Sequence, residues 1–388
     1  MAEDLLASQH RELEEGFHYI DENAEAFIAE QLAICGIPAP PGREQKRAAY
    51  LEGRFRDLGL GRVEIDAAGN VIGLRAGTGG GPTLAVAAHL DTVFGPEVEI
   101  RPRREGFILH GPGIADNAAG IVAMLAVADA LRHAGITLGG DVLFAGTVGE
   151  EGRGDLRGAR HLFTHSPLRD RIDYFVGIDE SDPELIITGG VGSKRYRVLF
   201  EGPGGHSWAD FGAVNPVHAL ARAISELSTY QVPASPRTSF NVGRIEGGIS
   251  VNTIAATAVA EVDLRSESNG ELAKLEKWLL NCVEAACARE NASATRVEHP
   301  VKATCEVIGQ RPCGRTSSRS RLVRVAVRCL ENFGLKPRLG WGSTDSNIPM
   351  SMGIPAVTLP YGGRGVVHRV DDWHDVRGRE ASLKALLH

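Results

Sequence analysis

Charged side chains that directly follow apolar runs constrain this chain more than any other feature of its sequence. Three such runs, LAVAAHLD, DVLFAGTVGEE and YFVGID, end at His89 and Asp91, at Glu150 and Glu151, and at Asp179. Continuous apolar runs are typical of buried parallel strands, and open α/β sheets bind ligands at the carboxyl ends of their strands. We therefore expect an open α/β sheet with a polar site at that edge.

Two further residues join this set from glycine-rich turns. Asp116 lies in GPGIADNAAG, just before a helix expected over residues 118–133, where it could instead be the helix N-cap. His368 follows YGGRGVV, and Asp371 or Asp372 could orient its ring. Two imidazoles and several carboxylates suit a pair of zinc-like ions. The sequence predicts two divalent metal ions, Zn²⁺ in the first place, with Mn²⁺ or Co²⁺ as alternatives.

The spacing of the strand-end residues indicates separate roles. His89 and Asp91 point the same way because they are two residues apart on one strand. His89 could bind a metal through one ring nitrogen while Asp91 accepts a hydrogen bond from the other. Glu150 and Glu151 are costly to place side by side at a buried strand end unless a cation relieves them. Their side chains diverge, so one could bind metal while the other acts as a base; a solvated acidic pair is the alternative.

The length of 388 residues favours two domains. The alternation of strands and helices changes near Val191, where a strand, a helix opening at Asn215-Pro216, two strands, a helix and a strand at ATRVEHPV (294–301) follow. This order is typical of a ferredoxin-like layer. We predict a mostly parallel α/β catalytic domain, residues 1–193 and 308–388, interrupted by an α+β domain at residues 194–307.

The inserted domain carries polar residues with a possible role in catalysis. His206, in the turn GGHS, could donate a hydrogen bond to a developing oxyanion. Asn252 and Arg265 lie on or beside strands, and the guanidinium fork could clamp a substrate carboxylate. An exposed strand arginine without function is the alternative for Arg265.

Composition narrows the class of partner. The net charge of −7 and the lack of a basic run argue against nucleic acid. The acidic N-terminus is not a secretory signal, and no segment has the length of a membrane span. The six cysteines form no CxxC pair, which favours free thiols in a reducing cytoplasm. We expect a cytoplasmic protein with a small-molecule substrate.

From about residue 30 to 375 these motifs together resemble the M20 family of co-catalytic zinc metallopeptidases and amidohydrolases. The resemblance implies one metal held by His89, Asp116 and Asp179 and a second held by Glu151, Asp116 and His368. It also implies that Asp91 orients the first histidine and that Glu150 is the general base. Many relatives have a lysine where this chain has Ala118, and a glutamate where it has Asp371 and Asp372.

The resemblance extends to the inserted domain and to the backbone. GGHS resembles a lid motif whose histidine often reaches the neighbouring subunit through a lid-mediated dimer, so a homodimer through this domain is expected. Whether His206 acts in its own chain or in the partner stays open. Asn252 and Arg265 match substrate-binding positions, and a cis peptide is expected between Asp116 and Asn117.

The expected reaction is hydrolysis of amide bonds in small peptides by a tripeptidase-like exopeptidase. An N-acyl amino acid deacylase using the same site is the first alternative. A non-catalytic binding protein on the same fold is a more distant one. The sequence leaves open whether a peptide would be cut from its amino or its carboxyl end.

Overall fold

The computed structural model describes residues 2–296 and 299–388. The chain divides into two compact units, which we call the first unit (Met1–Gly190 with Gly314–His388) and the inserted unit (Val191–Cys313). The chain returns to the first unit after residue 313, later than the predicted boundary at residue 307. The reason is that the last strand of the inserted unit continues to Arg311, which pairs with Ser193. None of the helices within the described ranges is long and apolar enough to cross a membrane.

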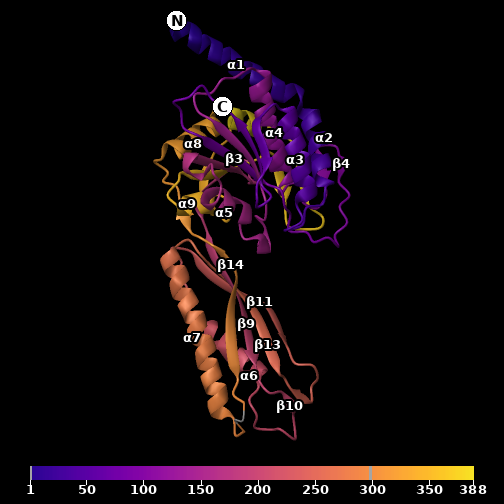
Figure 1. Ribbon diagram of the computed structural model, residues 1–388, viewed down its shortest axis with the longest axis vertical. Coiled ribbons are helices and arrows are strands. Elements are labelled where there is room, and N and C mark those ends of the chain that lie inside the picture. The colour runs from indigo at the N-terminus through magenta and orange to yellow at the C-terminus, as the bar shows by residue number, and fades with distance from the viewer. Residues whose placement is uncertain (1, 297–298) are drawn as a thin grey trace. The chain divides into compact units, whose positions relative to one another are not determined.

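The first unit is built on a nine-stranded sheet, of which Figure 1 labels β3. The strand order is β1-β2-β6-β3-β7-β17-β8-β15, with β16 beside β8. The strands are β1 Gly61–Ile65, β2 Val71–Arg75, β3 Leu84–His89, β6 Val142–Thr147, β7 Tyr174–Ile178, β8 Leu185–Gly190, β15 Gly314–Arg315, β16 Arg338–Gly342 and β17 Ala356–Leu359. Strands β6, β3, β7 and β17 at its centre are parallel. The expectation of a mostly parallel sheet was wrong for the flanks, so the sheet is mixed.

Short connections explain the antiparallel flanks. A parallel neighbour needs a crossover of a dozen or more residues. Residues 76–83 between β2 and β3, and residues 179–184 between β7 and β8, are too few for such a crossover. β3 is parallel to β6, and β7 is parallel to β17. β2 therefore pairs antiparallel with β6, and β8 antiparallel with β17.

Helices cover both faces of this sheet. They are α1 Ala2–Glu22, α2 Ala24–Cys35, α3 Gln45–Asp57, α4 Ala118–His133, α5 Arg157–Thr164, α8 Arg321–Asn332, α9 Asn347–Ser351 and α10 Arg379–Leu387. Val86 and Ala88 of β3 pack in the core that contains α4, whereas Ala85 and Ala87 pack in the core that contains α5. Because both faces are buried, the central strands are apolar throughout, and polar residues gather at the strand ends.

A small second sheet of the first unit places two loops together. Its order is β18-β19-β5-β4, formed by Arg364–Val366, Trp373–Asp375, Ile108–His110 and Arg103–Glu105. β5 leads into the turn of residues 111–116, and β18 and β19 flank the loop of residues 367–372. The Gly111 amide donates to the Asp372 carbonyl across 3.0 Å, which joins the two loops directly.

The inserted unit is an antiparallel four-stranded sheet in the order β11-β13-β9-β14, with helices α6 and α7 packed on it. Its elements are β9 Gly192–Glu201, β10 Gly205–His206, α6 Pro216–Leu227, β11 Thr238–Gly247, β12 Thr253–Ile254, β13 Thr257–Ser266, α7 Asn269–Ser293 and β14 Lys302–Arg311. The order is ferredoxin-like, as the pattern predicts. Asn215 caps α6 by accepting the Val217 amide at 3.0 Å.

The last strand of this unit was misplaced by the sequence prediction. It begins at Lys302, after the expected range 294–301, in which residues 297–298 lie outside the described part of the chain. The Thr295 and Arg296 amides both donate to the Gly212 carbonyl and not to a strand of the four-stranded sheet. The segment KATCEVIGQR alternates as well, and it is this segment that pairs with β9.

Candidate active site

The expected ligand side chains of the first unit meet at the carboxyl edge of its central strands. His89 ends β3, and its Nε2 lies 2.8 Å from Asp116 Oδ1 and 3.4 Å from Asp179 Oδ1. Asp116 ends the 111–116 turn, and Asp179 directly follows β7. The His89 side chain is 1% exposed.

A second histidine faces the other side of the same aspartate. His368 Nε2 lies 2.9 Å from Asp116 Oδ2 and 3.0 Å from Glu151 Oε1. Asp116 thus directs Oδ1 to one histidine and Oδ2 to the other. A carboxylate in this arrangement could bind two cations, one beside each histidine.

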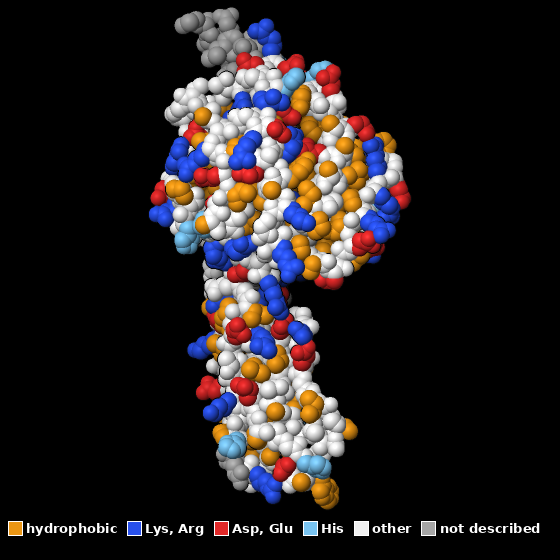
Figure 2. All heavy atoms as spheres, turned by 45° about the vertical axis from the view of Figure 1, so that its right-hand side comes forward, with side chains coloured by type: hydrophobic (Ala, Val, Ile, Leu, Met, Phe, Trp, Pro, Cys, Tyr) orange, Lys and Arg blue, Asp and Glu red, His pale blue; other side chains and the backbone are white. Residues whose placement is uncertain are grey.

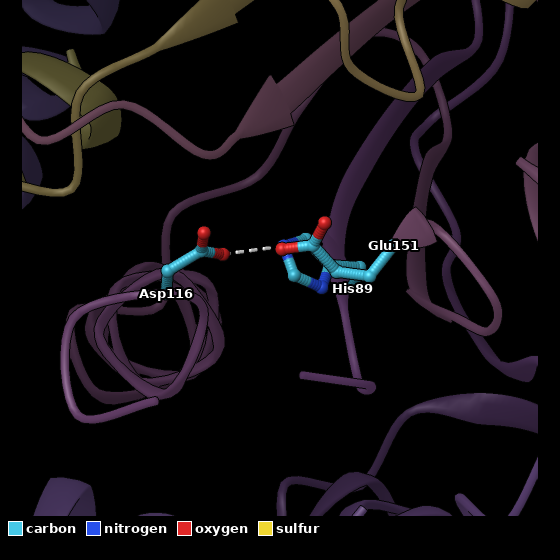
Figure 3. A group of neighbouring side chains, drawn as sticks. All are labelled: His89, Asp116 and Glu151. Atoms are coloured by element: carbon cyan, nitrogen blue, oxygen red, sulfur yellow. Dashed lines mark ion pairs between the residues drawn. The ribbon is translucent and has the colours of Figure 1, made fainter. Parts of the chain in front are cut away.

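The nitrogen and oxygen atoms of this cluster are placed better for binding metal ions than for hydrogen-bonding to one another. His89 Nε2 and Asp116 Oδ1 are buried and 2.8 Å apart, yet neither makes a hydrogen bond within the described part of the chain. His89, Asp116 and Glu151 each offer a ligand atom, all within 4.8 Å of one another, and Figure 3 shows the three side chains converging. Converging imidazole and carboxylate groups, among which the buried atoms His89 Nε2 and Asp116 Oδ1 lack a hydrogen bond, form a suitable divalent metal site.

The electrostatics of the cluster favour bound positive charge. Burial opposes protonation of His89, but Asp179 and Asp116 outweigh it and raise its pKa well above the usual value. Hydrogen bonds to Asp116 and Glu151 raise the pKa of His368 to about 10. Burial, assisted by the neighbouring carboxylates, raises the pKa of Asp179 to about 7. The raised pKa values favour protonation of His89, His368 and Asp179 in the absence of cations, and bound cations would take the place of those protons.

Asp91 holds the site in a different way from the one expected. The His89 Nδ1 hydrogen bond goes to the Asp91 main-chain carbonyl at 3.0 Å, and the carboxylate Oδ1 is 3.7 Å away. The carboxylate oxygens accept the Glu150 and Glu151 amides at 2.9 and 2.8 Å. Because these amides occupy it, the Asp91 carboxylate positions the two glutamates, and the carbonyl orients the imidazole.

Glu150 and Glu151 follow β6 on a turn fixed by those bonds. They are 4% and 7% exposed, so the solvated acidic pair considered as an alternative does not occur. Glu151 points to His368, as described above. Glu150 is buried at the same turn, one residue before a ligand candidate, which is where a base beside the metals would have to lie.

The turn that carries Asp116 is fixed on both sides. Asn117, and not Asp116, caps α4, because its Oδ1 accepts the Gly120 amide at 3.0 Å. The Asn117 Nδ2 also donates to the Ile178 carbonyl at the end of β7. The Asp116–Asn117 peptide is cis, as expected. Asp116 is therefore left to face the two histidines.

Asp372 links the two loops of the site through their backbones. Its Oδ1 accepts the Arg369 amide at 2.8 Å, and its Oδ2 accepts the Gly113 amide at 3.1 Å. Asp371 forms an ion pair with the Arg369 side chain. Asp372 thus positions His368 through the loop backbone, whereas the sequence suggested a contact with the ring.

A buried polar network that the sequence did not reveal supports the same loops. Gln31 Nε2, from α2, lies 2.7 Å from the Ile114 carbonyl and 2.8 Å from His374 Nδ1. His374 Nε2 lies 2.8 Å from the Gly362 carbonyl, and Arg379 donates to Gln31 Oε1 at 3.0 Å. Gln31 is 343 residues from His374 in sequence. No local pattern could have indicated this contact.

Two of the three candidate residues of the inserted unit, His206 and Asn252, lie on or directly beside an exposed two-stranded ribbon. His206 of β10 pairs with Thr253 of β12, and the Ser207 amide donates to the Asn252 carbonyl at 3.0 Å. His206 Nδ1 accepts the Trp208 and Ala209 amides at 3.2 and 3.3 Å. This leaves the proton on Nε2, where it is available for donation.

Arg265 lies on β13 of the inserted unit, apart from this ribbon. Its Nε donates to Asp263 Oδ2 at 2.6 Å, two residues along the same strand. Arg195 also contacts Asp263. A substrate carboxylate at Arg265 would therefore compete with a carboxylate that is already present.

Sheet, insertion and paired histidine–carboxylate site together define a metallohydrolase architecture, and comparison with known proteins identifies the family. The model of peptidase family M20/M25/M40 matches residues 85–388. The chain belongs to this family and is a hydrolase of peptide or amide C–N bonds.

The names of individual relatives indicate different substrates. A putative LysW-lysine/LysW-ornithine hydrolase of Aeropyrum pernix is 29% identical over 82% of this chain and 81% of its own. A succinyl-diaminopimelate desuccinylase of Corynebacterium glutamicum is 24% identical over 87% and 89%. A solved tripeptidase of Staphylococcus aureus superposes with a TM-score of 0.79, at 24% identity over 93% and 96% of the chains, which shows a shared fold.

Proposed function

We propose that this protein is a di-zinc exopeptidase of small peptides, with tripeptides as its preferred class. The single observation that best supports metal-dependent chemistry is that Asp116 directs one carboxylate oxygen to His89 and the other to His368. His89, Asp116 and Asp179 would hold one ion, and Glu151, Asp116 and His368 the other. When bound, two such ions supply a nucleophilic water and polarise the scissile carbonyl.

The protein side chains would move the protons. Glu150 would take the proton of the attacking water and pass it to the leaving amine. The burial of Glu150 and the two amides that fix its turn support this role. His206, with its Nε2 proton directed by the turn, would donate to the tetrahedral oxyanion. Asn252, beside the His206 ribbon, and Arg265 would bind the substrate terminus.

A second candidate function is removal of an acyl group from an N-acyl amino acid. The relatives named as desuccinylase and LysW hydrolase favour it. Both reactions break an amide bond and need the same base and metals. A panel of tripeptides, dipeptides and N-acetyl and N-succinyl amino acids, assayed on metal-analysed protein, would decide. Turnover of tripeptides at least tenfold above acyl amino acids supports the first function, and the reverse ratio supports the second.

We also expect a homodimer through the inserted unit. β11 and β14 form the two edges of its sheet, and an exposed edge is stabilised when a second copy pairs with it. Ile245 on β11 is 59% exposed, which gives that edge an apolar contact to offer. Light scattering would give the state in solution, with a monomer contradicting this expectation. The cytoplasmic location also stays a prediction.

Complementation would show in which chain His206 acts. Two inactive variants, His206→Ala and Glu150→Gln, are mixed under conditions in which labelled subunits exchange. Partial return of activity would mean that His206 serves the partner's site, because one site of the mixed dimer then has both residues. Failure to recover activity despite proven exchange would mean that His206 acts in its own chain or not at all.

A further inference from the structure

The most exposed apolar side chains of the inserted unit gather beside His206 and Asn252. Where the structure describes exposure, four large hydrophobic side chains are more exposed than all others: Trp208 at 87%, Phe211 at 83%, Ile249 at 92% and Val251 at 101%. The next in order, Val370 of the first unit, is 66% exposed. All four lie within five residues of His206 or Asn252 in the sequence. Apolar side chains gathered in this way usually mark a binding surface, and we call these four the apolar patch.

The backbone of Trp208 is fixed relative to the His206 ring. Its amide donates to His206 Nδ1 at 3.2 Å. The His206 amide donates to Asp210 Oδ2 at 2.7 Å, and the Asp210 amide donates to the His206 carbonyl at 2.9 Å. Asp210 also forms an ion pair with Arg296 at 3.5 Å. The turn that holds the proposed oxyanion donor therefore also holds the residue that carries the indole.

The second half of the apolar patch is joined to the same turn. The Thr253 amide donates to the Ser250 carbonyl at 3.3 Å, so Val251 and Asn252 are the central residues of a tight turn. The Ser207 amide donates to the Asn252 carbonyl at 3.0 Å, which links this turn to the one that follows β10. Apolar side chains thus flank both residues of the ribbon to which the proposed function assigns contacts with the substrate.

The position of the apolar patch determines which part of a substrate it contacts. When His206 donates to the oxyanion, residues hydrogen-bonded to its ring lie beside the amino acids on either side of the cleaved bond. An apolar surface gains little from a glycine, whereas each Å² of apolar substrate surface that it buries contributes about 25 cal/mol. Tryptophan is among the side chains that bury the largest area in such contacts. The patch therefore favours amino acids with large apolar side chains.

We propose that Trp208 is a specificity-determining residue, whose indole binds an apolar side chain next to the amide bond that is cleaved. Val251, on the neighbouring turn, supports the same contact. The substrates are then peptides or N-acyl amino acids with leucine, or a residue of similar character, at that position. The inference rests on the proposed function and names the substrate class of the same site.

The test compares leucine with glycine in otherwise identical substrates, on the metal-loaded wild type and on Trp208→Ala. The substrates are triglycine, the three tripeptides in which one glycine is replaced by leucine, N-acetylglycine and N-acetylleucine. For the wild type we expect kcat/KM to be at least about tenfold higher for the best leucine substrate than for its glycine counterpart. In Trp208→Ala this ratio should fall to about one, with the change mainly in KM. Alanine keeps the backbone amide that donates to His206, so the oxyanion donor stays in place.

Control variants separate this role from simpler ones. Trp208→Phe should keep most of the preference for leucine, and Phe107→Ala, which removes a 58% exposed ring from the first unit, should leave it unchanged. No preference in the wild type, or an unchanged ratio in Trp208→Ala, would overturn the proposal. Light scattering on that variant would then show whether the patch instead joins two copies of the chain. If the wild type cleaves neither the peptides nor the acyl amino acids, the proposed function fails, and this inference fails with it.

Discussion

The candidate residues of the first unit and those of the inserted unit are held in opposite ways. In the first unit, His89, Asp91 and Asp116 are buried or nearly so, and each is fixed by partners from distant parts of the chain. In the inserted unit, His206 and Asn252 are exposed, and their side chains bond to groups within three residues in the sequence. His206 Nδ1 accepts the Trp208 and Ala209 amides, and the Ser250 hydroxyl donates to Asn252 Oδ1. Metal binding needs a preorganised cluster, whereas groups that meet the substrate must remain accessible.

On one face of the molecule, surface charge does not distinguish the two units. On the face drawn in Figure 2, acidic and basic side chains are interspersed over both. The difference is therefore one of burial and connectivity. It predicts that substitutions in the first unit change metal content or the chemical step, and that those in the inserted unit change catalysis without changing metal content.

The largest effect should come from Glu150→Gln. The amide keeps the size of the side chain but cannot accept the water proton, so kcat should fall by roughly 10²–10⁴. Both metals should stay bound, as measured by elemental analysis. Glu151→Gln is the contrasting variant, since it should lose metal as well as activity. Near-normal turnover in Glu150→Gln would exclude it as the base.

A somewhat smaller loss is expected for His206→Ala. Removing one oxyanion donor should lower kcat by about 10²–10³ while metal content and melting temperature stay unchanged. His218→Ala is a suitable control, because His218 is also an exposed histidine of the inserted unit. If His206→Ala loses metal, the contrast between the two units is wrong.

The His374 network should give the first unit a dependence of stability on pH. Burial lowers the pKa of His374 from 6.5 to about 4. As the pH falls, His374 is therefore protonated in the unfolded chain before it is protonated in the folded protein. The free energy of unfolding that His374 contributes above pH 6.5 is lost as the pH falls toward 4. The loss is about 3 kcal/mol at 1.36 kcal/mol per pKa unit. Urea unfolding of the metal-free protein at several pH values should show a shallower dependence in His374→Gln, and equal slopes would contradict this.

The smallest effect is expected for Arg265→Ala. Hydrogen bonds to charged groups contribute about 1.5–3 kcal/mol, but Asp263 already engages this guanidinium. We expect KM to rise about tenfold or less with kcat nearly unchanged, and substrates lacking a terminal carboxylate to be unaffected. An equal rise for those substrates would mean that Arg265 serves the fold.

Sequence patterns predicted best those residues whose placement depends on burial along one strand. Apolar runs ending in charge brought out His89, Glu151 and Asp179, because a strand buried on both faces is polar only at its ends. An apolar run does not indicate whether a strand is parallel or antiparallel to its neighbours, so the sequence did not predict that β2 and β8 are antiparallel to the central strands. It also cannot distinguish a side-chain oxygen from a carbonyl, so it did not indicate that the Asp91 carbonyl lies nearer to His89 Nδ1, at 3.0 Å, than the carboxylate does, at 3.7 Å.

Contacts across the chain were beyond the reach of sequence patterns. Gln31 and His374 meet over 343 residues.

Metal stoichiometry tests the central claim, that Asp116 joins two metal sites, most directly. Elemental analysis of protein saturated with Zn²⁺ and freed of excess should give two ions per chain for the wild type. His89→Ala and His368→Ala should each keep one ion, and Asp116→Ala should keep none. One ion or none in the wild type, or two in Asp116→Ala, would contradict the account.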